Sequence, residues 1–246
     1  MDKNKNININ INSNVAETAT NPSLDTNEDK MVFDTKYKTK ILLVRHGESQ
    51  GNAKRVYLGH TDLDLSENGY LQAEMTAALL RDVKIDEIYS SSLKRAVNTA
   101  VPHAKLHGLP IHAEDALREI YLGDWENLPI DLLMTEHRDK FIGEWTENFG
   151  IARPPHGESV EEAAERFLGR LFEIARENIG KTVLVTAHAA VIRASFAKAS
   201  GIPADRVAKE LPFPANASVS VLYFDGARFI PGEYSHASHL TEKQKI

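Results

Sequence analysis

The sequence contains no cysteine, and this absence removes several kinds of chemistry at once. Without a thiol there can be no disulfide bond, no thiolate nucleophile and no cysteine-ligated metal. No stretch reaches the ~18 apolar residues of a membrane span, and the first residues lack the apolar core of a secretory signal. We therefore expect no signal peptide and no membrane partner, and we expect a cytoplasmic protein.

Excess positive charge is also absent. Lysine and arginine number 29 against 35 aspartate and glutamate residues, which gives a formal net charge of -6. An acidic chain without a basic tract is not expected to bind nucleic acid. Any site for a small anion must therefore be a local basic pocket. A hydrophobic fraction of 42% over 246 residues is enough for one large α/β domain with a substantial core.

Composition divides the chain into unequal parts. Residues 1–37 are rich in Asn, Ser, Thr and Asp, and we expect a disordered tail, although the Ile-Asn alternation at 6–12 also fits an edge strand. Residues 38–235 should form the folded domain. Within it, residues 128–155 show mixed helical periodicity and are expected to form a cap, and residues 236–246 are expected to be a C-terminal tail.

Two aliphatic strands end in a histidine. Ile41–Val44 are four aliphatic residues in a row, followed at once by Arg45, His46 and Gly47. Residues 182–186 form a second such run, which leads to His188. Strands buried on both faces read as continuous apolar runs, and open α/β sheets bind ligands at the carboxyl ends of their strands. Because strands alternate with helical stretches, we predict a three-layer α/β/α sandwich with a mostly parallel sheet.

Helix starts carry recognisable signals. Ser66 is a good N-cap, the hydroxyls of residues 90–92 precede a helix that places Arg95 in its first turn, and Ser159 with Glu162 matches a capping box. An arginine beside the unpaired N–H groups of a helix start favours an anion there. Residues 218–234, with Asp-Gly at the centre, predict a hairpin.

Six ordered motifs span the chain from about residue 40 to 234. They are Leu-Val-Arg45-His46-Gly47-Glu48-Ser49 with Asn52, Tyr-Leu-Gly-His-Thr-Asp62-Leu-Asp-Leu-Ser-Glu-Asn-Gly69, Ser-Ser-Ser-Leu-Lys-Arg95-Ala-Val-Asn-Thr-Ala, Leu-Arg-Glu119-Ile-Tyr-Leu-Gly123-Asp-Trp125-Glu126, Pro-Pro-His-Gly157-Glu158-Ser159 with Arg166, and Val-Thr-Ala-His188-Ala-Ala-Val-Ile-Arg193. Together they resemble the histidine phosphatase superfamily, in the branch shared by small-molecule phosphatases and cofactor-dependent phosphoglycerate mutases. The resemblance implies a phosphoglycerate mutase-like fold.

The resemblance implies catalytic or binding roles for six residues in these motifs. His46 would be the nucleophile that becomes phosphohistidine, and neutral imidazole is a competent nucleophile near pH 7. Glu119 falls where the family has its proton donor, a role that needs a raised pKa. The phosphoryl oxygens would be surrounded by Arg45, Arg95 and His188, with Asn52 as an additional donor, because the transition state spreads charge over three oxygens.

Other interpretations of single residues stay open at this point. Glu119 has charged neighbours and could form a surface salt bridge, and Asn52 could be a turn residue. His103 and His107 have the i, i+4 spacing of a helical metal pair, but no third ligand is evident, so an exposed helix face is the prediction. We expect no metal and no cofactor.

The chain also departs from the family pattern. Where the family often has two glycines after its second histidine, this chain has Ala189 and Ala190. Leu58 replaces a glutamine that is frequent in the family, and His156 replaces a common glycine. The alanine methyl groups would narrow the phosphate pocket or shift His188. These differences bear on the substrate more than on the chemistry.

The reaction that fits best is metal-independent hydrolysis of a phosphomonoester, with a small phosphorylated metabolite as the partner. The Gly-Asp-Trp-Glu segment after Glu119 is similar to phosphatase members, and it also resembles α-ribazole phosphatases. Two alternatives are a phosphoglycerate mutase-type phosphotransferase and a catalytically silent module that binds phosphorylated ligands. The sequence leaves a homodimer open.

Overall fold

Six strands form a single sheet. The computed structural model describes residues 37–241, so the predicted tail over residues 1–37, apart from its last residue, and the alternative strand at 6–12 lie outside the described residues. The strands are β1 (Thr39–Arg45), β2 (Glu87–Ser91), β3 (Ile111–Glu114), β4 (Thr182–Ala187), β5 (Val219–Phe224) and β6 (Phe229–Pro231). Their order in the sheet is β3-β2-β4-β1-β5-β6. The first four are parallel and the last two antiparallel, which confirms the mostly parallel sheet and the hairpin.

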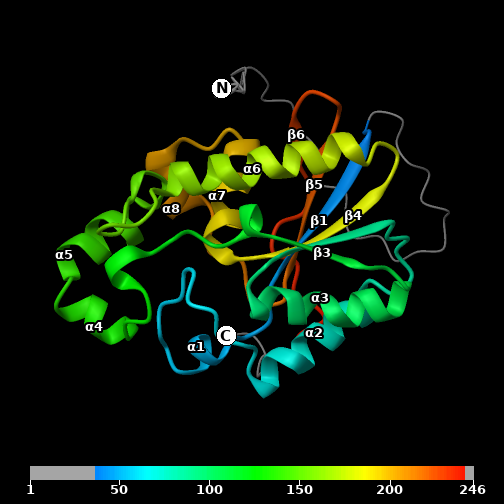
Figure 1. Ribbon diagram of the computed structural model, residues 1–246. Helices are drawn as coiled ribbons and strands as arrows, with labels where there is room; N and C mark the ends of the chain where they lie inside the picture. The colour runs from blue at the N-terminus through cyan, green and yellow to red at the C-terminus, as the bar shows by residue number, and fades with distance from the viewer. Residues whose placement is uncertain (1–36, 242–246) are drawn as a thin grey trace, which may run out of the picture.

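Helices cover both faces of this sheet (Figure 1). One face carries α2 (Glu67–Leu79) and α3 (Lys94–His107), and the other carries α6 (Val160–Glu177) and α7 (Ala189–Ala199). The shorter helices are α1 (Gln50–Ala53), α4 (Ile130–Thr135), α5 (Arg138–Lys140) and α8 (Val207–Glu210). The predicted three-layer α/β/α sandwich is therefore confirmed.

The aliphatic run in β1 explains why two layers of helices are needed. Successive side chains of a strand point to opposite faces. Ile41 and Leu43 accordingly belong to one buried cluster with residues of α6 and α7, whereas Leu42 and Val44 belong to a second cluster with residues of α2 and α3. All four are fully buried. The central strand therefore fixes the position of its polar carboxyl end between the two layers.

The predicted helix starts are partly confirmed. The hydroxyl of Ser66 accepts a hydrogen bond from the N–H of Gly69 at the start of α2, and Ser159 forms the expected capping box with Glu162 on α6. The capping prediction for residues 90–92 is wrong, because α3 begins after Leu93 and has no side-chain cap. The serine hydroxyls here make other contacts, described below.

The predicted exposed helix face at His103 is also wrong. The side chain of His103, on α3, is fully buried, and burial lowers its pKa to about 3. His103 is therefore a neutral imidazole packed in the core. Among residues 37–241, no three His, Asp or Glu side chains are arranged to hold a metal ion.

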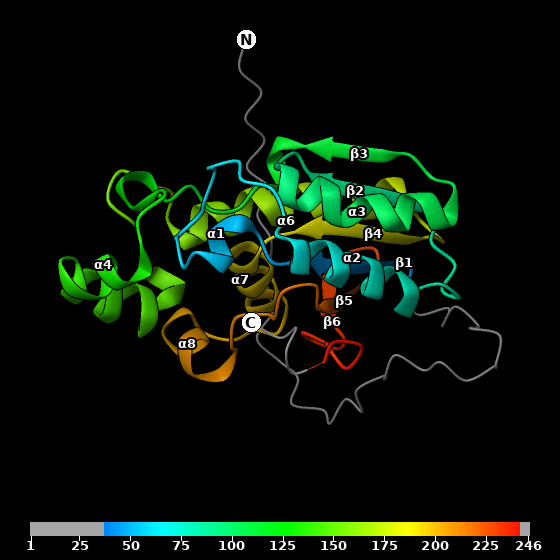
Figure 2. The same cartoon turned by 90° about the horizontal axis from the view of Figure 1, so that it is seen from below.

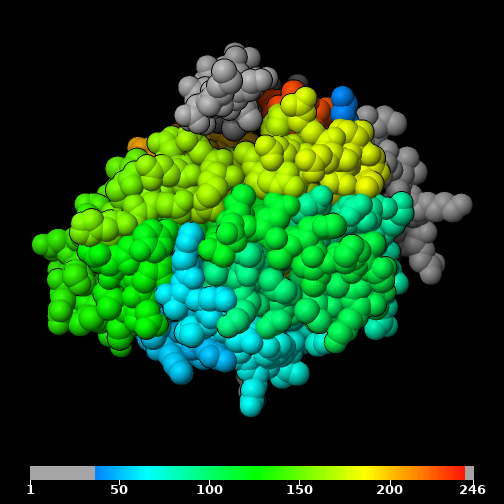
Figure 3. Space-filling model, in the orientation of Figure 1, coloured from blue at the N-terminus to red at the C-terminus, as the bar shows by residue number. Residues whose placement is uncertain are grey.

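A group of short helices extends beyond the end of the sheet, between residues 128 and 155 (Figure 2). The loop after β1 lies against this segment, as the light-blue and green surfaces in Figure 3 show. Backbone hydrogen bonds join them, from the N–H of Tyr57 to the carbonyl of Leu128 and from the N–H of Ile130 to the carbonyl of Arg55. The two segments therefore form one wall.

The chain continues along the sheet after β6. The N–H of His236 donates to the carbonyl of Val219 at 2.8 Å, the reverse bond is 2.9 Å long, and Leu240 is buried. The folded part thus continues past residue 235, where the sequence suggested that a tail begins. None of the helices between residues 37 and 241 is both long and apolar enough to cross a membrane.

Candidate active site

Strand register brings the two histidines together. β1 and β4 are parallel neighbours with Arg45 opposite Ala187, so the residues that follow them, His46 and His188, leave the sheet side by side. The N–H of His46 donates to the carbonyl of Ala187 at 2.9 Å. The two imidazole rings have a centroid distance of 5.1 Å and an interplanar angle of 61°. Residues 142 positions apart therefore share one site.

The backbone at Gly47 fixes which nitrogen of His46 can react. His46 Nδ1 lies 2.7 Å from the carbonyl oxygen of Gly47. A carbonyl can only accept a hydrogen bond, so Nδ1 must carry the proton and the lone pair is on Nε2. A Cβ atom at position 47 would lie 2.4 Å from the carbonyl oxygen of Gly69. Glycine is required here by close packing against another backbone segment.

Two arginines are held by main-chain carbonyls. Arg45 Nη1 donates to the carbonyl of Pro214 at 2.6 Å, and Arg95 donates to the carbonyls of Gly59 and Thr61 at 2.7 and 2.9 Å. The Nε atoms of both arginines are buried and have no hydrogen-bond partner among the described residues. Buried donors without partners are costly. They are the groups that an anion would satisfy.

His188 presents a third donor of this kind. Its Nε2 lies 2.7 Å from Ser91 Oγ, and that oxygen already accepts from the N–H of Leu93. The serine hydroxyl can give its own proton to Nε2, and in that arrangement the ring proton of His188 is on Nδ1. Nδ1 is buried and has no partner within residues 37–241. In this tautomer His188 can donate to an anion.

The electrostatics of the site keep both histidines neutral. Burial lowers the pKa of His46 well below its ordinary value, and the positive charges of Arg95 and Arg45 lower it further. Burial and the charge of Arg95 have the same effect on the pKa of His188. Burial also lowers the pKa of both arginines to about 10, which leaves them charged at neutral pH. The pocket thus combines two neutral imidazoles with two desolvated cations.

The side chain of Glu119 is buried against the first residues of α7. Its carboxylate oxygens accept hydrogen bonds from the N–H groups of Ile120, Ala190 and Val191 at 3.0 to 3.2 Å. Burial raises the pKa of Glu119 and outweighs these hydrogen bonds and the charge of Arg95, which act in the opposite direction. Because the side chain is 7% exposed, the alternative of a surface salt bridge is wrong.

Asn52 is a turn residue, as one of the two interpretations expected, and its side chain also lines the cavity described below. Its Oδ1 accepts from the N–H of Ser49, and its own N–H donates to Ser49 Oγ, which closes the first turn of α1. Asn216 Nδ2 donates to the carbonyl of His46 and lies 3.3 Å from Asn52 Oδ1. With Oδ1 engaged in this way, the amide nitrogen is the part of Asn52 left for the cavity that this residue lines.

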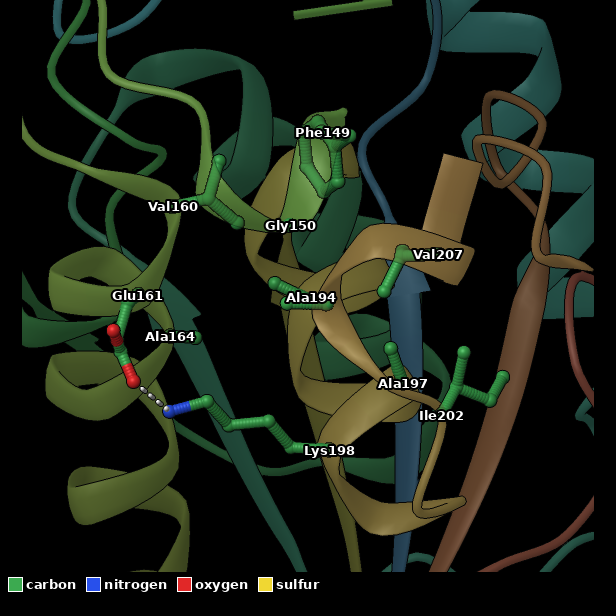
Figure 4. A pocket seen from close by; sticks show the side chains of 11 residues that line it. Phe149, Gly150, Val160, Glu161, Ala164, Ala194, Ala197, Lys198, Ile202 and Val207 are labelled. Carbon is green, nitrogen blue, oxygen red and sulfur yellow. Dashed lines mark ion pairs between the residues drawn. The ribbon is translucent and has the colours of Figure 1, made fainter. Parts of the chain in front are cut away.

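Most of these side chains line one cavity of about 340 Å³; His188 lies behind His46 and is not among the lining residues. Of the predicted site residues, the cavity is lined by Arg45, His46, Asn52, Arg95 and Glu119, and the ring of His188 contacts that of His46. A second cavity of about 140 Å³ lies between α6 and α7 (Figure 4). Its walls are mostly aliphatic, with one ion pair of 3.7 Å between Lys198 and Glu161 and no histidine. The chemistry therefore belongs to the first cavity.

A family model described as the histidine phosphatase superfamily (branch 1) matches residues 41–234. The chain belongs to the histidine phosphatase superfamily. It is 33% identical over 204 residues to phosphoserine phosphatase 1 of Hydrogenobacter thermophilus, which covers 82% of this chain and 95% of that protein. It is 32% identical over 169 residues to the adenosylcobalamin/alpha-ribazole phosphatase of Escherichia coli, with 68% and 81% covered.

The fold of this histidine phosphatase is similar to that of solved members. Bacillus stearothermophilus YhfR superposes with a TM-score of 0.76 at 30% identity, covering 82% of this chain and 98% of that chain. The phosphoglycerate mutase-like fold is thereby confirmed, as is the general class of a histidine-dependent phosphatase for small phosphorylated substrates.

Several residues of this histidine phosphatase site were missed in the sequence. Ser91 was read as a helix cap, although its place at the end of β2, beside β4, gives it access to His188. Asn216 and Phe213 come from the segment before β5, which has no motif. The two alanines noted as departures, Ala189 and Ala190, both line the cavity. His156 has a φ of 55°, a conformation that favours the glycine common at this position.

Proposed function

We propose that the protein hydrolyses a phosphomonoester in two steps, with His46 as the nucleophile. Nε2 of His46 attacks phosphorus, the ester oxygen leaves, and a phosphohistidine forms; water then attacks this intermediate and releases inorganic phosphate. The observation that carries the proposal is the combination of a neutral His46, protonated on Nδ1, with three buried nitrogen atoms that lack partners within the described part of the chain: Arg45 Nε, Arg95 Nε and His188 Nδ1. Such donors stabilise charge that develops on the transferred phosphoryl group.

Glu119 would supply and remove the proton. A carboxyl whose pKa is raised by burial can protonate the leaving alkoxide in the first step and deprotonate water in the second. Asn52 would add a donor to one phosphoryl oxygen. No step in this scheme requires a metal ion, and two cationic arginines take the part that a metal plays in other phosphatases.

The remaining assignments are proposals of the same kind. The catalytic domain would begin at residue 38, with residues 128–155 as a cap over the leaving group, because Ile130 and Trp145 line the cavity. We also propose that the protein acts in the cytoplasm, where small phosphorylated metabolites are produced, and that a homodimer is the assembly to test by light scattering.

Release of inorganic phosphate from p-nitrophenyl phosphate, with and without EDTA, tests the proposal. We expect turnover that EDTA does not change and that His46→Ala lowers at least a thousandfold, while the exposed-site control His112→Gln retains it. Full activity of His46→Ala would overturn the nucleophile assignment. Loss of activity in EDTA would indicate a metal enzyme, and binding of phosphate without turnover would indicate a silent module. A mutase would transfer phosphate between hydroxyls of phosphoglycerates faster than to water.

A further inference from the structure

The side chains that line the cavity fall into two sets with different chemistry. We call the part lined by the charged and polar groups that would hold the phosphoryl group the inner end, and the part lined by the other side chains the outer end. The outer end is lined by a set of mostly apolar side chains, namely Val56, Tyr57, Leu58, Ile120, Leu122, Ile130, Trp145 and Phe213, together with Arg55. The leaving group of a bound ester must occupy this outer end, because the inner end is filled by phosphate.

Three aromatic rings line the outer end, those of Tyr57, Trp145 and Phe213. Trp145 contacts Tyr57 with ring centroids 6.0 Å apart, and Trp145 Nε1 donates to Tyr57 Oη at 2.5 Å. The buried ring of Phe149 lies behind them and contacts Trp145 at 5.3 Å and Phe213 at 5.1 Å. Trp145 is buried and held by these contacts, so Phe213 presents most of the accessible ring surface.

A buried arginine holds these rings in place. The guanidinium carbon of Arg193 lies 4.2 Å from the ring centroid of Phe213 and 4.5 Å from that of Phe149. The guanidinium itself donates to the carbonyls of Leu211 and Val207 at 2.6 and 3.2 Å. Phe213 therefore has a fixed orientation although it is 39% exposed. A preformed aromatic surface binds a flat ring with little loss of side-chain entropy.

The cations that line the cavity already have other partners or positions. Arg55, at the outer end, pairs with Asp131 at 3.2 Å, and both side chains are mostly exposed, at 65% and 79%. Arg45 and Arg95 belong to the inner end. A carboxylate on the leaving group would have to compete with Asp131 for Arg55, and an ammonium group would lose its hydration against Leu58, Trp145 and Phe213, which is unfavourable.

We infer that the preferred substrates are phosphomonoesters of uncharged alcohols that carry an aromatic ring, bound with the ring against Trp145 and Phe213. The inference rests on the proposed function, since it concerns the leaving group of that same hydrolysis. It distinguishes this chain from relatives whose names specify phosphoserine, an amino acid ester with a carboxylate and an ammonium group.

A matched set of alkyl esters tests the preference. The substrates are 2-phenylethyl phosphate, ethyl phosphate and O-phospho-L-serine, which all release an aliphatic alkoxide, so that differences report binding of the group beyond the oxygen. We expect kcat/KM for the phenylethyl ester to exceed both others at least tenfold. Equal values, or a preference for phosphoserine, would overturn the inference and leave the phosphatase assignment intact. Absence of turnover with all three esters and with p-nitrophenyl phosphate would instead refute the proposed function.

Variants then locate the preference on the aromatic rings of the outer end. Phe213→Ala should reduce the ratio of the phenylethyl to the ethyl ester at least threefold, and Ile151→Ala, an exposed apolar residue of the cap that does not line the cavity, should leave it unchanged. Val56→Lys adds a cation to the outer end and should raise kcat/KM for phosphoserine relative to the phenylethyl ester. Thermal unfolding checks that each variant is folded. A ratio that Phe213→Ala and Val56→Lys both leave unchanged would overturn the assignment.

Discussion

Glu126 stabilises the loop that holds Arg95, and replacing it with glutamine should impair both stability and activity. Its carboxylate accepts hydrogen bonds from the N–H groups of Gly59, His60, Thr61 and Leu122 and from Thr61 Oγ, at 2.6 to 3.3 Å. The carbonyls of Gly59 and Thr61 in turn accept from Arg95. Glu126→Gln is nearly isosteric, so the change removes acceptors without opening a cavity.

The size of the effect follows from the donors that an amide cannot serve. Glutamine keeps one oxygen, so the amide NH₂ faces at least two donors that previously met a carboxylate oxygen, the N–H groups of His60 and Leu122. Hydrogen bonds to a charged group contribute about 1.5 kcal/mol each at the low end. We expect a loss of about 3 kcal/mol in the free energy of unfolding. For a domain of this size, that corresponds to a decrease in Tm of roughly 6–12 °C.

Differential scanning calorimetry and steady-state kinetics measure the two consequences. We expect kcat/KM for p-nitrophenyl phosphate to fall at least tenfold because Arg95 loses its supports. Glu136→Gln, an exposed change on the cap, is the control and should alter stability by less than about 0.5 kcal/mol. A Glu126→Gln variant with unchanged Tm and unchanged kcat/KM would refute the positioning role.

The same carboxylate gives a pH dependence of known sign. Burial alone would raise the pKa of Glu126, but the hydrogen bonds from Thr61, His60 and Leu122 outweigh burial and lower it. A lowered pKa contributes stability that is present above the ordinary value of 4.5 and is lost as pH falls through the folded-state value. The stability difference between wild type and Glu126→Gln should therefore be constant from pH 6 to 8 and shrink below about pH 4.5.

Three further changes probe separate parts of the site. Glu119→Gln should lower kcat at least a hundredfold for an alkyl ester, because its leaving group needs a proton. With p-nitrophenyl phosphate, burst kinetics separates the first step from the second, and the rate of the first step should fall far less. Ser91→Ala should lower kcat/KM about 10–100-fold, because His188 loses the hydroxyl that keeps its ring proton on Nδ1. ¹⁵N NMR of the ring reports the tautomer directly, and an unchanged tautomer would refute this role of Ser91. Gly47→Ala should destabilise the fold by about 1–3 kcal/mol, measured by urea unfolding, because its Cβ would meet the carbonyl of Gly69.

The chemistry of the inner end could be predicted from the sequence because it depends on strand ends. Parallel strands align their carboxyl ends, so a histidine after each of two aliphatic runs implies a shared site. The structure shows this alignment, because Arg45 at the end of β1 pairs with Ala187 at the end of β4. What the pattern did not contain is the order of strands. β2 lies beside β4, and only this adjacency brings Ser91 to His188.

The outer end could not be predicted because its residues come from segments far apart in the sequence. Tyr57 begins a motif but has no chemical role there, Trp145 lies in a π-helical segment of the cap, and Phe213 precedes β5. Their proximity depends on tertiary packing: Trp145 contacts Tyr57, and Arg193, which in the sequence was only the end of a motif, lies against Phe213. His103 shows the same limit, since its burial is set by the packing around α3 and not by its spacing from His107.

Trapping the covalent intermediate tests the central claim most directly. Wild-type enzyme is mixed with a ³²P-labelled phosphomonoester and quenched in alkali within milliseconds, and the labelled peptide is sequenced by mass spectrometry. We predict an alkali-stable, acid-labile phosphoryl group on His46 that appears at the rate of the first step and is absent in His46→Ala. Label on any other residue, or steady turnover by His46→Ala without a phosphoenzyme, would contradict the account.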